Sequence, residues 1–183
     1  MRRLRSIASM LFCLFASASL LTPLLLAQKD KPEPLTEAQI EEIREAGIDP
    51  NGRVNLYTKY VSEHADTIKS LANRSKSVTR AKRLDEELQD LTALMDEFGA
   101  NLDVYSDRHA DIRKALKPLT EATDRWLVIL RALAGEPSFD VARKEAIESG
   151  EDLADQAKRL QTEQTEYFKL HKDEQGQDRA EPK

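Results

Sequence analysis

The three histidines are the side chains in this sequence best suited to holding a metal ion or a haem. His64, His109 and His171 lie on or beside positions where apolar residues recur with helical spacing. Metal-binding helical bundles of the carboxylate type pair a histidine with a glutamate three residues before it. Here Glu63 directly precedes His64, and Glu166 lies five residues before His171. We therefore expect histidines at the edges of the apolar seams, bonded to water or carboxylates, with no metal and no cofactor.

Other reactive residues also lack the spacing that catalysis needs. The sequence has no Gly-x-Ser-x-Gly turn and no glycine-rich phosphate loop, and its single cysteine is Cys13. Acidic pairs and triplets fall on polar helix faces, where carboxylates normally stay solvated and form i,i+4 ion pairs. Residues 49–52 resemble the start of a calcium loop, but Arg53 and Tyr60 stand where oxygen ligands are required. We expect no catalytic residues and a non-enzymatic protein.

One charged segment is strongly asymmetric. Between Asp66 and Asp85 the chain carries six basic residues and no acidic residue. The six are Lys69, Arg74, Lys76, Arg80, Lys82 and Arg83. A local surplus of positive charge attracts anionic surfaces, so these residues are a candidate site for lipid headgroups, envelope polysaccharide or an acidic protein. The alternative is a solvated loop whose charge is offset by the acidic residues that follow it.

Composition excludes several classes of protein. The chain has 183 residues, with 28 Lys and Arg against 33 Asp and Glu, for a formal net charge of −5. The lack of a basic excess disfavours a dedicated nucleic-acid-binding protein. A single cysteine excludes an intramolecular disulfide framework and a cysteine-based zinc site.

The N-terminus has the segment order of a secretory signal peptide. Basic residues within the first five positions precede an apolar run from Ile7 to Leu26, and the polar stretch from Gln28 follows. We predict a signal peptide at residues 1–27, cleaved after Ala27, and hence a periplasmic or secreted protein. The alternative is an uncleaved segment that anchors the protein in the inner membrane, because the apolar run is long enough to span it.

Helix signals begin after a polar linker at residues 28–35. Thr36 and Gln39 have the spacing of a capping box, which predicts a short helix that ends at Gly47. Pro50 is placed at the first position of the next helix. From there apolar residues continue at steps of three and four, as on one face of a helix.

The clearest pattern is a seam of apolar positions that alternate spacings of four and three residues. Its members are Leu84, Leu88, Leu91, Met95, Phe98, Leu102, Tyr105, His109, Ile112, Leu116, Leu119, Thr123, Trp126, Leu130 and Leu133. A loop normally breaks such a phase, so we predict one long helix over residues 78–116, bent or ended at Pro118. The alternative for residues 78–134 is two helices joined by a turn near 99–107, where helix propensity is low.

These signals define an all-α protein. A last helix is predicted after Ser138, no run alternates with period two, and residues 173–183 are predicted to be a disordered tail. Residues 36–172 should form an up-and-down antiparallel bundle of three or four long helices with coiled-coil-like packing. The signal peptide and the short helix precede this bundle.

Three segments resemble a family of exported helical proteins from acidobacteria. They are EAGIDPNGRV at residues 45–54, AKRLDEEL at 81–88 and RKEAIESG at 143–150. That family is uncharacterised and has no known activity. The resemblance implies only a location in the cell envelope.

The sequence favours an exported structural or interaction module of the cell envelope, whose partner is an unidentified protein or an anionic envelope component. Two alternatives are a bundle that holds a metal, haem or lipid near Trp126, and a periplasmic chaperone-like protein. Nucleic acid is not an expected partner, and a membrane is one only if the signal segment stays uncleaved. The sequence does not decide between a monomer and a homo-oligomer.

Overall fold

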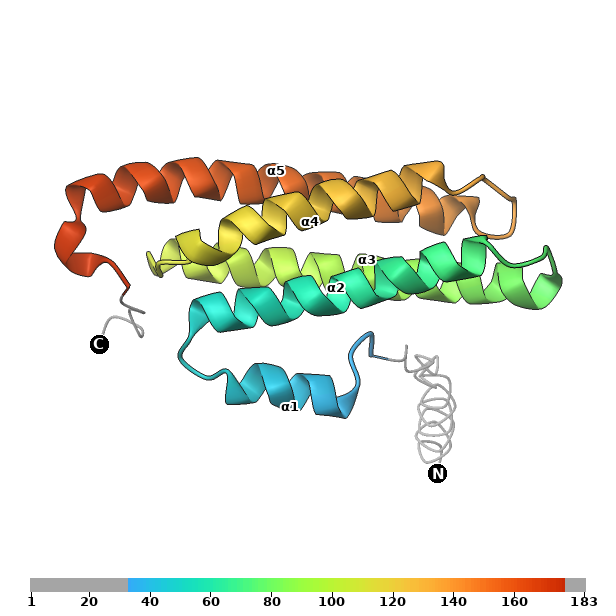
Figure 1. Cartoon of the computed structure of the whole chain (residues 1–183), viewed down its shortest axis with the longest axis horizontal. Helices are drawn as coiled ribbons and strands as arrows, with labels where there is room; N and C mark the ends of the chain where they lie inside the picture. The colour runs from blue at the N-terminus through green and yellow to red at the C-terminus, as the bar shows by residue number, and fades with distance from the viewer. Residues whose placement is uncertain (1–32, 177–183) are drawn as a thin grey trace, which may run out of the picture. The chain divides into compact units, whose positions relative to one another are not determined.

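The computed structural model describes residues 33–176. The predicted signal peptide, Cys13 and most of the predicted tail lie outside the described residues. The described helices are α1 (Glu37–Glu45), α2 (Pro50–Ala72), α3 (Val78–Asp107), α4 (Arg113–Ala132) and α5 (Asp140–Leu170), and a 3-10 turn follows at Lys172–Glu174 (Figure 1). No strand occurs within residues 33–176, and the all-α prediction is confirmed. Over the same residues, no helix combines the length and the apolar character that a bilayer span requires.

Local signals set the starts of the first helices as predicted. The Thr36 side chain accepts a hydrogen bond from the Gln39 amide at 3.3 Å, and the Gln39 side chain accepts one from the Thr36 amide at 2.8 Å. This reciprocal pair is the capping box expected from the sequence. Gly47 then reverses the chain with a φ of 55°, a left-handed value that glycine adopts without strain.

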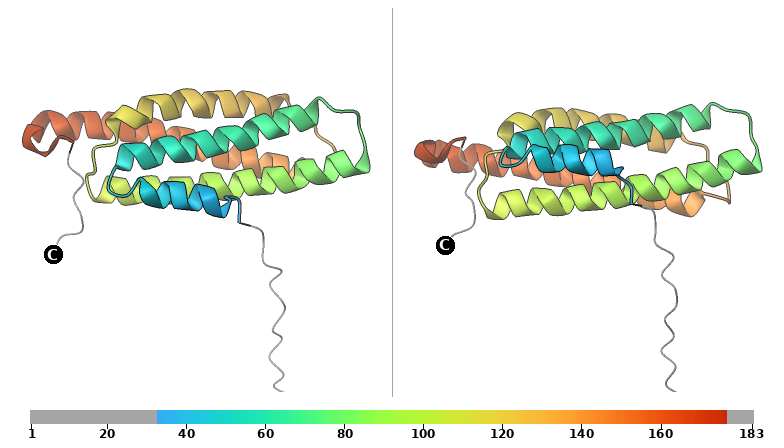
Figure 2. Two further views of the ribbon diagram at one scale, coloured as in Figure 1. Left: turned by 60° about the horizontal axis from the view of Figure 1, so that its bottom comes forward. Right: turned by 90° about the horizontal axis from the view of Figure 1, so that it is seen from below.

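The four long helices form two antiparallel hairpins, α2–α3 and α4–α5, that lie side by side (Figures 1 and 2). The first helices of the two hairpins are neighbours and run parallel. The Trp126 indole N–H donates to the Ser62 hydroxyl at 3.0 Å, and the Ala115 amide donates to the Asn51 side chain at 3.1 Å. Both pairs are 64 residues apart, and a constant offset is the mark of parallel helices in register.

The second helices of the hairpins, α3 and α5, are also parallel neighbours. Ser149 donates to Asp96 and Gln156 donates to Asp103, and each pair is 53 residues apart. The chain direction therefore alternates from helix to helix, and two of the four contacting pairs of long helices are parallel. The reason is the α3–α4 connection, which joins helices that do not lie beside each other.

The predicted single helix over residues 78–116 is wrong. α3 ends at Asp107, and residues 108–112 connect it to α4, which contains Pro118 in its interior. The alternative of two helices is confirmed. The position proposed for the turn is wrong, because residues 99–107 are helical and the connection follows them.

The apolar phase crosses this connection because the connection itself is buried. Ala110 and Ile112 are both 0% exposed, although neither is helical. Gln164 of α5 satisfies their backbone, since its side chain donates to the Ala110 carbonyl at 2.9 Å and accepts from the Ile112 amide at 3.1 Å. His109, with a φ of 53°, turns the chain.

The predicted seam supplies much of the core, which apolar residues of α2 and α5 complete. All members of the seam are buried except His109, and most of them are fully inaccessible. Gly150 lets α5 approach this core closely, because a Cβ atom added there would lie 3.1 Å from Leu127 Cδ2 and 3.7 Å from the Met95 sulfur. α5 continues through Gly150 without interruption.

Substitution of Gly150 by leucine should destabilise the protein. The added side chain must displace Leu127 or Met95, so we expect a loss of roughly 2 kcal/mol or more in the free energy of unfolding, despite the higher helix propensity of leucine. Urea denaturation measures it. The matched control is Ala100→Leu at an exposed helical position, where the change should stay within about 0.5 kcal/mol. Equal stability of the two variants would contradict the close approach at Gly150.

Candidate functional site

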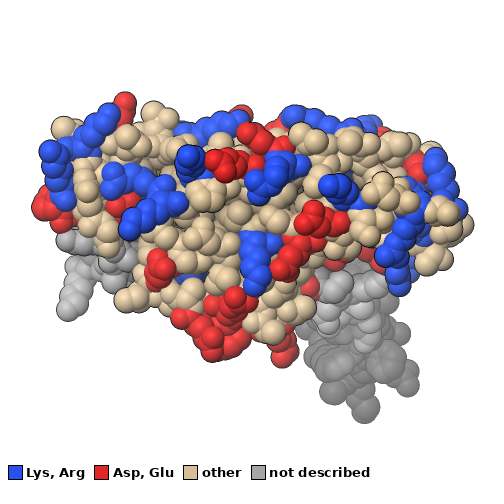
Figure 3. Space-filling view, in the orientation of Figure 1, with Lys and Arg blue, Asp and Glu red and all other residues tan. Residues whose placement is uncertain are grey.

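Five of the six basic residues singled out in the sequence are exposed and surround the turn between α2 and α3. They are Lys69, Arg74, Lys76, Lys82 and Arg83, called the basic end below. Lys and Arg side chains are visible at this end of the molecule, on the right in Figure 3. Val78, the first residue of α3, is 88% exposed between Lys76 and Lys82.

Arg80 is the exception, and its inclusion in an accessible patch is corrected. Its side chain is only 8% exposed. Its Nε donates to the Leu71 carbonyl at 3.0 Å, one Nη to the Ala72 carbonyl at 3.3 Å, and the other Nη to Glu136 at 3.0 Å. Because the last carbonyls of a helix have no partner within it, Arg80 completes the end of α2. It also ties this end to the connection between α4 and α5.

The Arg80–Glu136 pair shapes the electrostatics of this end. The hydrogen bond from Arg80 is the main cause that lowers the pKa of Glu136. Desolvation opposes it, and the charges of Lys76 and Arg80 add to the lowering. Glu136 therefore stays ionised at neutral pH and holds both cations, with Lys76 Nζ at 3.4 Å.

The remaining positive charge is only partly neutralised. The Lys82 Nζ atom lies 3.4 Å from a carboxylate oxygen of Glu86. Lys69, Arg74 and Arg83 form no ion pair within 4 Å in the part of the chain that the structure describes. Arg74 and Arg83 line a groove between α2 and α3. The same groove contains the acidic residues Asp66, Glu86, Glu87 and Asp90. Within this groove the two arginines therefore lie beside four acidic residues.

The three histidines do not converge on one point. His64 on α2 lies between Glu87 and the Pro34 carbonyl. His109 and His171 stack on the Tyr167 ring, with centroid distances of 4.3 and 4.1 Å. Within residues 33–176 no group of three or more His, Cys, Asp or Glu side chains could hold a metal ion.

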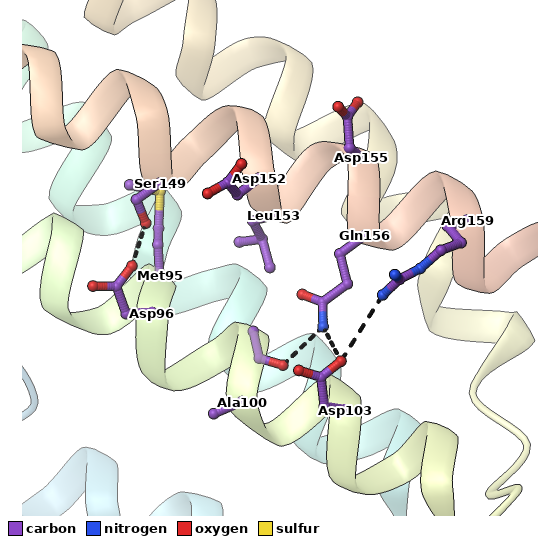
Figure 4. Close-up of a pocket in the computed structure, with 11 residues that line it drawn as sticks. Met95, Asp96, Ala100, Asp103, Ser149, Asp152, Leu153, Asp155, Gln156 and Arg159 are labelled. Atoms are coloured by element: carbon purple, nitrogen blue, oxygen red, sulfur yellow. Dashed lines mark hydrogen bonds and ion pairs between the residues drawn. The ribbon is translucent and has the colours of Figure 1, made fainter.

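A second surface of defined geometry is the groove between α3 and α5, with a volume of about 570 Å³ (Figure 4). Gln156 crosses it, donating to the Gly99 carbonyl at 3.0 Å and to Asp103 at 2.6 Å. Its exposed acidic residues are Asp96, Asp103, Asp152 and Asp155. The drawn contacts connect the two parallel helices, and the groove lining has four acidic residues against one basic residue, Arg159.

No known family model, curated protein or solved structure matches the chain. The resemblance to exported proteins of acidobacteria therefore stays a prediction. What the chain can bind has to be inferred from its own surface and contacts.

Replacement of Arg80 by glutamine should destabilise the bundle end. It leaves the buried Leu71 carbonyl and the part-buried Ala72 carbonyl without their donor, and it leaves Glu136 paired with Lys76 alone, so we expect a loss of roughly 2 kcal/mol in the free energy of unfolding. The matched control is Arg83→Gln, an exposed arginine three residues later, with an expected change below about 0.5 kcal/mol. Urea denaturation of both variants measures the difference.

The same variant should change the pH dependence of stability. A lowered folded pKa means that the Glu136 contribution is present above the ordinary value of 4.5 and is lost as the pH falls through the lowered value. Arg80→Gln removes the main cause of that lowering, so its stability should fall less steeply in acid. If the variant lost stability in acid as steeply as the wild type, this would contradict the role given to the Arg80–Glu136 pair.

Proposed function

We propose that the protein is a non-enzymatic, exported interaction module that docks through its basic end onto an anionic component of the cell envelope. The observation that carries the proposal is the clustering of five exposed cations around the turn between α2 and α3. Arg80, which lies on α3, holds this turn in place through hydrogen bonds to the end of α2 and to the α4–α5 connection.

The cations at this end are available to a partner. The side chains of Lys76 and Lys82 are each 76% exposed, and their ion pairs are 3.4 Å long. Solvated pairs of this kind contribute about 0–1 kcal/mol and are readily exchanged for another anion. Lys69, Arg74 and Arg83 add charge that no ion pair in the described residues offsets.

Anionic lipid headgroups are the partner that this surface fits best. Val78 is 88% exposed and lines a surface depression with Lys76 and Lys82, beside Asp85 and Glu136, so an exposed apolar side chain lies next to two exposed lysines. Basic residues next to an anionic membrane contribute about 1 kcal/mol each, and an apolar residue adds contact with the interfacial region.

A surface function is also supported by the filled interior. Trp126 is 2% exposed, its indole N–H is bonded to Ser62, and the surrounding seam side chains are buried. A haem or lipid among the helices would have to displace these groups. Burial of a seam with seven-residue periodicity supports coiled-coil-like packing as part of the proposal.

Export is the other part of the proposal, and it rests on the signal-peptide pattern of residues 1–27. Cleavage would release a periplasmic or secreted bundle. An uncleaved segment would instead tether the bundle to the inner membrane, where the basic end could contact the same lipids.

Charge reversal at the basic end should strongly weaken binding to anionic vesicles. We expect residues 28–183 to sediment with phosphatidylcholine vesicles containing phosphatidylglycerol, and not with phosphatidylcholine alone. Reversing Arg74, Lys82 and Arg83 to glutamate should weaken binding about 100-fold, and added salt should weaken the wild type.

The matched control reverses three exposed cations of α5, Lys158, Arg159 and Lys169. It changes the net charge equally and should bind much more tightly than the basic-end variant. Equal binding by the two variants, or equal binding of the wild type to neutral vesicles, would contradict the proposal.

A further inference from the structure

His64 joins three parts of the chain. It lies on α2, with its Nδ1 atom 2.7 Å from a Glu87 carboxylate oxygen on α3. Its Nε2 atom lies 3.0 Å from the Pro34 carbonyl, in the segment that leads into α1. The side chains of His64 and Glu87 are only 16% and 22% exposed.

Both neighbours of the ring can only accept hydrogen bonds. A carbonyl has no proton to give, and an ionised carboxylate has none either. The doubly protonated imidazolium donates to both at once, whereas a neutral imidazole has one N–H and can serve only one of them. The protonation state of His64 therefore decides whether the α1 segment and α3 are both bonded to α2.

The charges around the ring favour the protonated state. Burial of the ring is the largest single effect and opposes protonation. The hydrogen bond and charge of Glu87, the Pro34 carbonyl and the charge of Asp90 together outweigh it and raise the pKa of His64 above 6.5. The nearest charged residues in sequence are also acidic, namely Glu63 on α2 and Glu33 beside Pro34.

Residues 34–45, called the strap below, have few other attachments. Leu35 and Ile43 are buried, and Ile40 packs against the core. Glu42 accepts hydrogen bonds from Tyr60 and, at 3.4 Å, from Lys59. Gln39 donates a 3.2 Å hydrogen bond to Glu63.

The strap borders an open groove. This groove, of about 340 Å³, lies between the strap and the α2–α3 hairpin and reaches Tyr57. Helix α1 has nine residues, too few to be stable in water without packing. The strap can therefore open and unfold while the four long helices stay folded.

We propose that the strap is a pH-dependent cover, held on the bundle by protonated His64 and released in alkaline conditions, so that the Tyr57 and Tyr60 face of α2 becomes exposed. Tyr57 and Tyr60 are 3% and 1% exposed when the strap is closed. This goes beyond docking at the basic end, and neither depends on the other.

The direction of the pH dependence follows from two titratable groups, His64 and Glu42, that take part in hydrogen bonds between the strap and α2. A raised folded pKa means that the His64 contribution is complete below the ordinary value of 6.5 and is lost as the pH rises through the raised value. For Glu42, the Tyr60 hydrogen bond is the main cause that lowers the pKa, so its contribution is complete above 4.5 and is lost as the pH falls through the lowered value. Closure is strongest between these limits.

Amide hydrogen exchange of the full chain tests the proposal. Protection factors, corrected for the intrinsic exchange rate, are compared at about pH 5.5 and pH 8.5. Protection in α1 should fall about tenfold at the higher pH, the effect of one charge-assisted hydrogen bond, and should be well below protection in the middle of α3 at both pH values. Equal protection of α1 at the two pH values, or protection of α1 as high as that of α3, would overturn the proposal.

Variants assign the effect to His64. His64→Gln should give low α1 protection that no longer depends on pH in this range. Glu87→Gln should move the transition to lower pH, because it removes the main group that favours the protonated ring. The matched controls are His171→Gln and Glu86→Gln, which should behave like the wild type. A transition that persists in His64→Gln, or that stays in place in Glu87→Gln, would exclude the His64–Glu87 pair as its cause.

Discussion

Removal of one continuous set of apolar side chains from water determines where every long helix lies. Each fully buried leucine of the seam contributes about 2 kcal/mol, and the seam draws on α3, the α3–α4 connection and α4. Packing both hairpins on this set places α2 beside α4 and α3 beside α5. The turns of both hairpins then meet at one end, where Arg80 and Glu136 join them. Core packing therefore brings together the basic end and the Arg80–Glu136 pair that holds it to the second hairpin.

Local signals made much of the fold predictable. The capping box at Thr36 and the seven-residue seam have short-range causes and were readable in the sequence. The break between α3 and α4 was not, because Ala110 and Ile112 keep the apolar phase through it. Their backbone is satisfied by Gln164, more than 50 residues away, so no local signal marks the turn.

In the candidate site, too, some features have local sequence signals and others depend on residues far away in the chain. The run of basic residues was evident from composition, and five of its members are exposed. Arg80 differs because its partner Glu136 is 56 residues away. One signal was available, since Arg80 stands four residues before Leu84 and so continues the seam. The pairing of His64 with Glu87 and Pro34 likewise needs the tertiary structure.

The parallel contact between α2 and α4 is the arrangement that a simple up-and-down order lacks, and one measurement tests it directly. The chain has a single tryptophan, so the indole N–H of Trp126 gives one resolved proton signal. Nuclear Overhauser effects from this proton should connect it to Ser62 and its neighbours on α2. Connections to α3 in place of α2 would contradict the packing described for the whole bundle.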